Sequence, residues 1–444
     1  AKGIGRFALN RLGKTSLMLT APIGKKKIYE WEVNWTDFEK TGSTLSDVGA
    51  SLSIINSETF HERLKSFGLL AISAVKDLFH KDDFHGTILK ISDLNDLWDK
   101  HSLDSLYSSL ELLIPAHLAS DFTLYMFMLS DLKDFGKVNN SEYEDFDYKV
   151  YARYFGKSSR TISVEIERKE FNIPLLETEY KGVFEQPYMK EYPYRLEDFK
   201  QSSVKTEIPI SNNIDDKTLS KIGCFEFLFY FVKNTIKDDS DLNASKKYPY
   251  NPIDSTIRKQ WLKKFGGVKI YRDKFRVRPY GEPGNDWLRL GERQSQSPGG
   301  AGQKMGGYRI RPNQISGSVF ISRIENTSFE DKSSREGIME NDEFILFQNL
   351  LKLVIEAFEK DRNTIMYSLS QYYKLLHQNE DKAKKVSDTI NRRRDEDRKK
   401  QFSDNEKILA EGYSSLENEL SEKDAEIRML RSLASSGIAV ASFT

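Results

Sequence analysis

The sequence contains very little cysteine: Cys224 is the only one among 444 residues. A single thiol excludes a disulfide framework and a cysteine-based zinc site, and it fits a reducing compartment, so we expect a cytoplasmic protein. No apolar run is long enough to cross a membrane, and the first residues show no signal-peptide pattern, so we expect no membrane partner. The chain also begins without methionine, which we interpret as a piece of a longer protein.

The sequence has no excess of charge of either sign, because 67 Lys and Arg balance 67 Asp and Glu. Nucleic-acid binding favours a strongly basic surface, so the net charge does not support it. Only 38% of the residues are hydrophobic while 30% are charged, which indicates that part of the charge lies on an extended element exposed to solvent. The length is typical of two or three domains.

Proline is confined to the first part of the chain, since the last of twelve is Pro312. Before it, strand-like and helix-like segments alternate, which predicts an α+β protein built from two-layer α/β sandwiches. Polar and apolar residues alternate, as in half-buried strands, at 26–33, 87–94, 160–168 and 318–324. Helical spacing predicts helices at 105–118 and 225–236, with Cys224 at the start of the second. The segment 281–317 is rich in Gly, Ser and Gln, which predicts a long mobile loop.

The C-terminal part of the chain has a helical character. An amphipathic helix is predicted from about Asn341, and residues 379–431 contain no proline and one glycine, Gly412. Apolar residues there follow a heptad spacing that is interrupted at Glu406 and Lys423: Phe402, Leu409, Tyr413, Leu416, Leu420, Ile427 and Leu430. A lone helix of this kind is marginal in water, so we predict a homodimeric coiled coil. The alternative is a long charged helix folded back on its own domain.

The opening segment, Lys2-Gly3-Ile4-Gly5-Arg6, leads into a predicted helix that begins near Phe7. The glycines let the backbone approach a phosphate closely, and a helix N-terminus presents free N–H groups and the positive end of its dipole. Lys2 and Arg6 add positive charge. We predict that this segment binds phosphate; a simple turn, which uses the same glycines, is the alternative.

These residues carry a resemblance to a known superfamily. KGIGRFALNRLG resembles the glycine box of the GHKL ATPases, which include gyrase, the ninety-kilodalton heat-shock chaperones, histidine kinases and MutL. HGTILKISDL is similar to the Gly-Thr strand that closes the same nucleotide site, so the resemblance implies that Thr87 lines an ATP pocket. Segments 266–293 and 327–344 resemble a prokaryotic branch related to the chaperone and MORC ATPases. Segment 429–444 resembles the helix that precedes a histidine-kinase-like His-Glu pair.

The resemblance also implies a domain order. Residues 1–135 would be the phosphate-binding half of a GHKL ATPase domain, 136–340 a transducer domain with the loop 281–317, 341–430 the coiled coil, and 431–444 the start of a histidine-kinase-like helix. In the superfamily, an earlier helix carries a Glu that activates water and an Asn that holds Mg²⁺, and an Asp-x-Gly loop reads adenine. All of these would precede Ala1. We therefore expect ATP and Mg²⁺ as cofactors of the parent protein, with the catalytic pair outside this chain.

The resemblance further implies a γ-phosphate sensor, because a basic transducer residue reaches the nucleotide in related ATPases. Lys304, Arg309 and Arg311 lie in the Gly-rich segment and are the predicted sensors, since an Arg fork can donate two hydrogen bonds to one phosphate. Arg335 is a second candidate on resemblance alone. A surface loop whose charges serve solubility is the alternative.

The predicted function is an ATP-binding, ATP-hydrolysing conformational switch, in which closure of the ATP lid passes through the transducer to the coiled coil. A histidine-kinase-like signalling protein is one alternative, and a non-catalytic dimeric scaffold with a degenerate ATPase fold is another. His80, Asp82, Asp83 and His85 are plausible metal ligands, but their spacing matches no recognised site, so we predict a polar loop and no metal.

Overall fold

The computed structural model describes residues 7–24, 27–39, 49–73, 75–76, 85–114, 123–138, 143–156, 159–233, 247–332 and 337–396, with Gly412, Ser414, Ser415 and Lys423. The fold is mixed α+β, as the sequence predicts. It forms two compact units, one from Ala1–Glu111 with Ser120–Asn139 and one from Leu112–Ala119 with Asn140–Thr444. Among the described residues, no helix combines the length and the apolar content that crossing a membrane requires.

The first unit is built on a four-stranded antiparallel sheet with the order β3-β2-β1-β4. Its strands are β1 (Gly13–Ala21), β2 (Ile28–Asn34), β3 (Ala50–Ile55) and β4 (Gly86–Leu94). Its helical segments are α1 (Phe7–Leu12), η1 (Trp35–Glu39), α2 (Ser57–Ser66), η2 (Leu69–Ala71) and α4 (Lys100–Glu111). A separate hairpin follows, formed by β5 (Tyr125–Met128) and β6 (Asp131–Lys137).

Helix α2 covers one face of this sheet. Asn56 starts the helix, because its side chain accepts a hydrogen bond of 2.8 Å from the backbone of Thr59. Phe60 and Leu64 of α2 are buried against Leu19 of β1.

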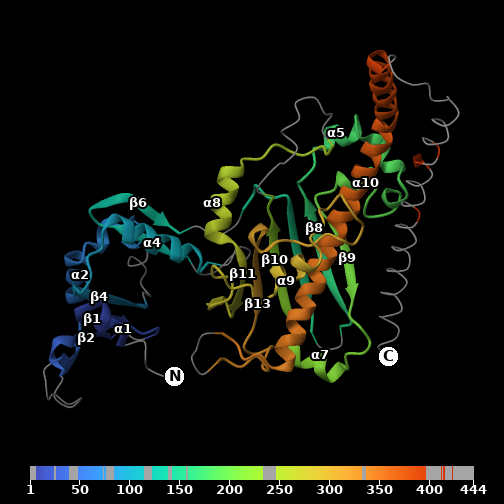
Figure 1. The fold of residues 1–444 in the computed structure, drawn as a ribbon. Coiled ribbons are helices and arrows are strands. Elements are labelled where there is room, and N and C mark those ends of the chain that lie inside the picture. Colours follow the sequence, from blue (N-terminus) through green and yellow to red (C-terminus); the bar gives the residue numbers. More distant parts are fainter. Residues whose placement is uncertain are drawn as a thin grey trace. The chain divides into compact units, whose positions relative to one another are not determined.

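The second unit contains a seven-stranded sheet with the order β12-β11-β13-β10-β7-β8-β9 (Figure 1). The strands are β7 (Tyr148–Tyr154), β8 (Thr161–Arg168), β9 (Val204–Pro209), β10 (Phe225–Phe231), β11 (Gly267–Arg272), β12 (Phe275–Val277) and β13 (Ile315–Ile321). The helical segments are α5 (Ile173–Glu177), η3 (Lys181–Glu185), η4 (Pro187–Met189), α6 (Leu196–Phe199), α7 (Asp216–Ile222), α8 (Ser255–Phe265), α9 (Leu290–Gln296), η6 (Pro312–Gln314) and α10 (Asp342–Glu396). Only the β11–β13 pair is parallel among the described ladders of this sheet.

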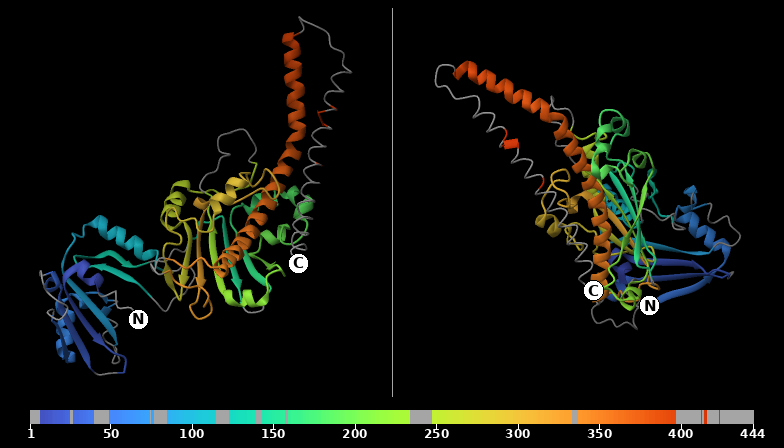
Figure 2. Two further views of the ribbon diagram at one scale, coloured as in Figure 1. Left: turned by 60° about the horizontal axis from the view of Figure 1, so that its bottom comes forward. Right: turned by 90° about the vertical axis from the view of Figure 1, so that its right-hand side faces the viewer.

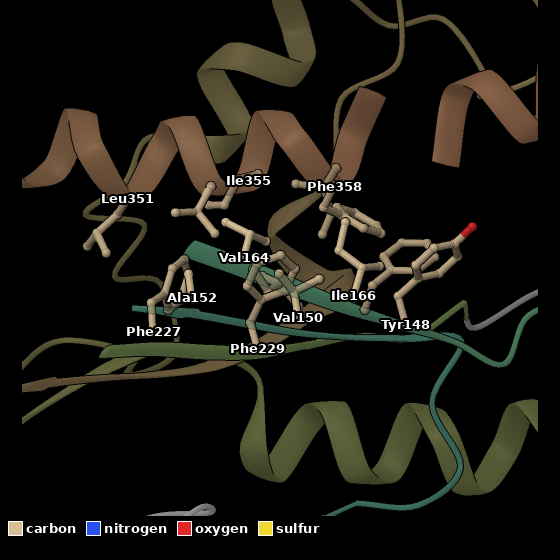
Figure 3. Packing of buried hydrophobic residues seen from close by; sticks show 14 of the residues in the cluster. Tyr148, Val150, Ala152, Val164, Ile166, Phe227, Phe229, Leu351, Ile355 and Phe358 are labelled. Atoms are coloured by element: carbon tan, nitrogen blue, oxygen red, sulfur yellow. The ribbon is translucent and has the colours of Figure 1, made fainter. Parts of the chain in front are cut away.

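The core of the second unit lies between this sheet and the first half of α10. Figure 3 shows Leu351, Ile355 and Phe358 pointing from α10 onto the sheet. The Phe358 ring lies 5.2 Å from that of Tyr148 and 5.6 Å from that of Phe229, between ring centroids. Helix α10 therefore belongs to the core for its first half. The sequence places its start correctly near Asn341, but a separate coiled-coil region does not begin there.

The prediction of a helix at 225–236 is wrong, because this segment contains the strand β10. Phe227 and Phe229 of β10 lie in the core under α10, whereas Leu228 and Tyr230 pack on the other face with Trp261 of α8. A strand buried on both faces carries apolar residues at every position, so the alternation typical of half-buried strands is lost. Cys224 lies just before this strand and is not helical.

The segment 281–317 is also more ordered than the sequence predicts. It contains α9 and η6, and it buries Leu288, Leu290 and Tyr308 in the core. The indole Nε1 of Trp287 donates a 2.8 Å hydrogen bond to the carbonyl of Val268 in β11. These contacts fix the Gly-rich segment on the sheet, so the expected long mobile loop is replaced by a packed, irregular layer.

Candidate functional site

All five residues of the predicted phosphate-binding segment, Lys2, Gly3, Ile4, Gly5 and Arg6, lie outside the described residues, as does the second sensor candidate, Arg335. Helix α1 begins at Phe7, directly after the predicted segment. Its C-terminal end is fixed by Asn95, whose side-chain amide donates hydrogen bonds of 3.0 Å to the carbonyls of Asn10 and Arg11. This contact anchors α1 beside the end of β4.

Thr87 lies at the start of β4, beside Thr20 of β1. Their hydroxyl oxygens are 3.0 Å apart. Since β1 and β4 are antiparallel and Gly13 pairs with Leu94, α1 and Thr87 mark opposite ends of the same strand pair. The separation along β4 is roughly 23 Å at the usual rise of a strand residue. A ligand that contacts both would have to lie along the strand.

The face of the sheet that carries Thr87 is largely apolar, and we call it the Thr87 face. The ladder pairs align two rows across all four strands, Leu52–Trp31–Met18–Leu89 and Ile54–Tyr29–Thr20–Thr87. Leu52, Ile54 and Leu89 are 69%, 60% and 45% exposed. Helix α2 packs on the opposite face of the sheet, and η1 reaches one end of the Thr87 face, where the indole of Trp35 donates a 2.9 Å hydrogen bond to Ser16. Contiguous exposed apolar surface of this kind marks a place where another element or a ligand binds.

The three predicted sensor residues Lys304, Arg309 and Arg311 lie together in the second unit, before η6. Lys304 and Arg311 are exposed, whereas Arg309 is partly buried. The Arg309 guanidinium donates to the carbonyls of Gly306 (3.1 Å) and Tyr308 (2.7 Å). It also lies 3.8 Å from the Glu359 carboxylate. Arg309 is thus held by its own turn, and Lys304 and Arg311 are the more accessible cations.

Helix α10 holds this turn through two polar residues that the sequence analysis missed. The Glu359 carboxylate accepts hydrogen bonds from the backbone of Ile310 (2.9 Å) and from Arg293 (3.0 Å). The Asn363 amide donates to the carbonyls of Ala301 (2.5 Å) and Lys304 (3.1 Å), and its oxygen accepts from the Gly306 backbone. The turn that carries Lys304 is therefore attached to α10 by direct hydrogen bonds.

Two further ion pairs join α10 to the end of β8. Arg168 binds Asp361 through hydrogen bonds of 3.0 and 2.5 Å, and both side chains are almost completely buried. Arg362 binds Glu170 through hydrogen bonds of 2.8 and 2.6 Å, also buried. In the sequence, the run Glu359–Asn363 is indistinguishable from the solvent face of an amphipathic helix.

Burial shifts the ionisation of several groups in this region. Burial raises the pKa of Glu359, and Arg293 opposes the shift. For Glu170, burial also acts to raise the pKa, but the adjacent Arg362 and Lys233 outweigh it and lower the pKa. Burial lowers the pKa of Lys233. The arrangement pairs opposite charges across the core, and we interpret it as a structural network.

Lys269 of β11 is a separate buried cation. Its ammonium donates to the carbonyls of Phe265 and Gly266, at the C-terminal end of α8. Burial lowers its pKa to about 7, and the charge of Arg276 adds to the effect. A cation at this position interacts favourably with the negative, C-terminal end of the α8 dipole. We therefore interpret Lys269 as a cap of α8.

The structure offers no metal site in the described ranges, where no group of His, Cys, Asp and Glu could hold an ion. Most of the histidine- and aspartate-containing segment at 80–85 lies outside those ranges. Comparison with protein-family models gives no match for this chain. A search of curated proteins gives no match either. The function is therefore inferred from the motifs and the geometry alone.

Proposed function

We propose that this chain is part of an ATP-driven conformational switch of the GHKL superfamily. In this proposal, the first unit is the C-terminal part of the ATPase α/β sandwich, and the second unit is an α/β transducer. The observation that carries the proposal is the position of Thr87. The strand that opens with Gly86-Thr87 pairs with the strand that follows the glycine motif and α1, and Thr87 lies on the exposed apolar face.

The Thr87 face gives the proposal a physical basis. In this proposal, two groups cover the apolar surface beside the hydroxyls of Thr20 and Thr87. One is the nucleotide base, and the other is the helix expected to carry the catalytic Glu and the Mg²⁺-binding Asn. Such surface binds the flat part of a ligand by burial, while a few hydroxyls orient it. Backbone N–H groups of Gly3, Ile4, Gly5 and Arg6 would bind the triphosphate at the α1 end of the sheet, assisted by Lys2.

The exposed cations of the second unit would bind the γ-phosphate and so distinguish ATP from ADP. Lys304 and Arg311 are the stronger candidates, because Arg309 already binds two carbonyls and lies near Glu359. The bonds from Asn363 to the same turn would pass a displacement of Lys304 to α10.

The test is ATP binding by an N-terminally complete protein that carries Gly5→Val. A valine side chain would block the close approach of the backbone to phosphate, so we expect a loss of affinity of roughly tenfold or more, or about 1.4 kcal/mol. Gly49→Val is the matched control, because an added side chain there meets no atom within 4 Å. Unchanged affinity in Gly5→Val would reject the assignment. No ATP binding by the complete wild-type protein would favour the non-catalytic scaffold.

A further inference from the structure

The strand β9 is the last strand at one end of the seven-stranded sheet, and among the described strands it pairs with β8 alone. In the right-hand view of Figure 2, which faces this side of the sheet, α10 runs along one face of the sheet. The middle residues of the strand, Lys205, Thr206 and Glu207, are exposed. An edge strand of this kind presents backbone N–H and C=O groups with which a strand of another chain can pair.

The register of β9 on β8 determines which backbone groups point to the free edge. The N–H of Ile210, just after β9, donates a 2.8 Å hydrogen bond to the carbonyl of Arg160, just before β8. In an antiparallel pair, residues that exchange hydrogen bonds alternate with residues that do not. The even-numbered residues of β9 therefore bond to β8, whereas Lys205, Glu207 and Pro209 direct their backbone groups to the free edge.

Tyr192 occupies the first of these outward positions. Its hydroxyl accepts a 2.8 Å hydrogen bond from the N–H of Lys205 and donates one of 2.8 Å to the carbonyl of the same residue. The phenol thus makes both bonds that a residue of a neighbouring strand would make. At the other end of the edge, Pro209 has no N–H to donate. Of the three outward-facing residues, Glu207 alone keeps both backbone groups available in the described structure.

The segment that carries Tyr192 is anchored on both sides of the ring. Met189 is buried, and the carbonyl of Pro193 accepts a 2.8 Å hydrogen bond from Arg168. Arg168 is also paired with Asp361 of α10. The Tyr192 side chain itself is 48% exposed, so it can leave the edge without uncovering the core. A movement of α10 that disturbs Arg168 would reach the Tyr192 segment directly.

We propose that Tyr192 is a latch that keeps the β9 edge closed, and that its release lets β9 pair antiparallel with β9 of a second copy of this chain. The sequence Lys205-Thr206-Glu207 identifies the partner. When two copies pair about a twofold axis through Thr206, Lys205 of each copy lies opposite Glu207 of the other. Opposite charges directly across an antiparallel pair stabilise it.

Charge also selects this register over its neighbours. Moving the axis by one residue in either direction places Lys205 opposite Lys205, or Glu207 opposite Glu207, and like charges directly opposite are destabilising. In the favoured register, each pair of Lys205 and Glu207 exchanges both backbone hydrogen bonds, and no N–H is required of Pro209. Lys205 can make these bonds only after the Tyr192 hydroxyl has left its backbone.

The experiment is cysteine cross-linking in the full chain, after Cys224→Ala removes the native thiol. Thr206→Cys places a thiol on the twofold axis, where the Cα atoms of facing residues are about 4.5 Å apart and a disulfide can form. Adding Tyr192→Ala should raise the yield of covalent dimer on mild oxidation by about fivefold or more, because the competing hydrogen bonds are lost. The matched control, Phe275→Ala, removes an exposed ring from the opposite edge strand, β12, and should leave the yield unchanged.

Two charge variants test the register in the Tyr192→Ala background. Lys205→Glu places like charges opposite each other and should remove most of the dimer. Adding Glu207→Lys restores opposite charges in exchanged positions and should bring the dimer back. Tyr192→Phe removes the hydroxyl and keeps the ring, so it should raise the yield in the same direction and provides the test if Tyr192→Ala does not fold.

Three outcomes would overturn the proposal. Equal dimer yields with and without the Tyr192 hydroxyl would show that this residue does not close the edge. A yield that does not respond to the two charge variants would exclude the register. No dimer in any variant would exclude a second copy as the partner of β9.

Discussion

The ion pair between Arg168 and Asp361 provides the sharpest test of how α10 is held on the sheet. Asp361→Asn keeps the shape of the side chain but removes the charge that neutralises Arg168. Both side chains are more than nine-tenths buried, and Arg168 also donates a 2.8 Å hydrogen bond to the carbonyl of Pro193. Arg168 therefore stays in place as a buried cation without its counter-ion. Breaking a buried pair in this way costs about 3–5 kcal/mol.

Because the chain contains two units, a single global unfolding transition is not a safe measure of this loss. Hydrogen exchange of α10 peptides reports the local opening free energy directly. The expected loss corresponds to roughly two to four powers of ten in the opening constant of the α10 segment near Asp361. The exposed pair between Lys332 and Glu340, 4.0 Å apart, gives the matched control, Glu340→Gln. This control should change stability by less than about 1 kcal/mol.

A second variant separates charge from packing. Arg168→Met combined with Asp361→Leu removes both charges and fills most of the volume, so much of the lost protection should return. The reasoning is refuted if Asp361→Asn changes exchange in α10 no more than Glu340→Gln does. It is also refuted if the double variant is less protected than Asp361→Asn, since the cost would then come from shape and not from the unpaired charge.

Three further predictions concern other parts of the second unit. The folded-state pKa of Lys269 is about 7, below the unfolded value of 10.5. Between these two values the unfolded chain binds more protons than the folded chain, so the free energy of unfolding should rise with pH across this window. The variant Lys269→Met should abolish this rise, as measured by urea unfolding at each pH. Tyr192 donates to and accepts from the backbone of β9 at 2.8 Å, so Tyr192→Phe should cost about 1 kcal/mol and speed exchange in that edge strand, measured by mass spectrometry. In the complete protein, Lys304→Ala or Arg311→Ala should lower ATP turnover with little change in ADP affinity, whereas Arg309→Ala should mainly loosen the turn. Wild-type turnover in all three variants would reject the assignment of these residues as the γ-phosphate sensor.

The alternation of polar and apolar residues predicted four of the strands. The segments 26–33, 87–94 and 160–168 correspond to β2, β4 and β8, and 318–324 overlaps the end of β13. The strand β10 was missed, because α10 and α8 bury both of its faces and remove the alternating pattern. The order in 281–317 was missed for a different reason: it comes from contacts made by Glu359 and Asn363, residues far away in the chain.

The candidate site was only partly accessible to sequence reasoning. The glycine motif and Thr87 could be found because local spacing identifies them, and the assignment of both to an ATP site stays a prediction. The apolar row across the sheet, from Leu52 to Leu89, depends on the register of four strands, which no local pattern specifies. The polar run Glu359–Asn363 could not be recognised as buried, because a helix surface is read as solvent-facing until its neighbours are known.

Helix α10 is continuous over 55 residues, with no proline to bend it. Its first half is clamped to the sheet, and the stretch from Tyr372 to Glu396 extends for ~36 Å. A rigid rod fixed at one end acts as a lever, so a tilt of about 5° at the clamp moves the far tip by about 3 Å. Rearrangements at Asn363 or Glu359 too small to disturb the core would thus become displacements as large as a side chain at the tip.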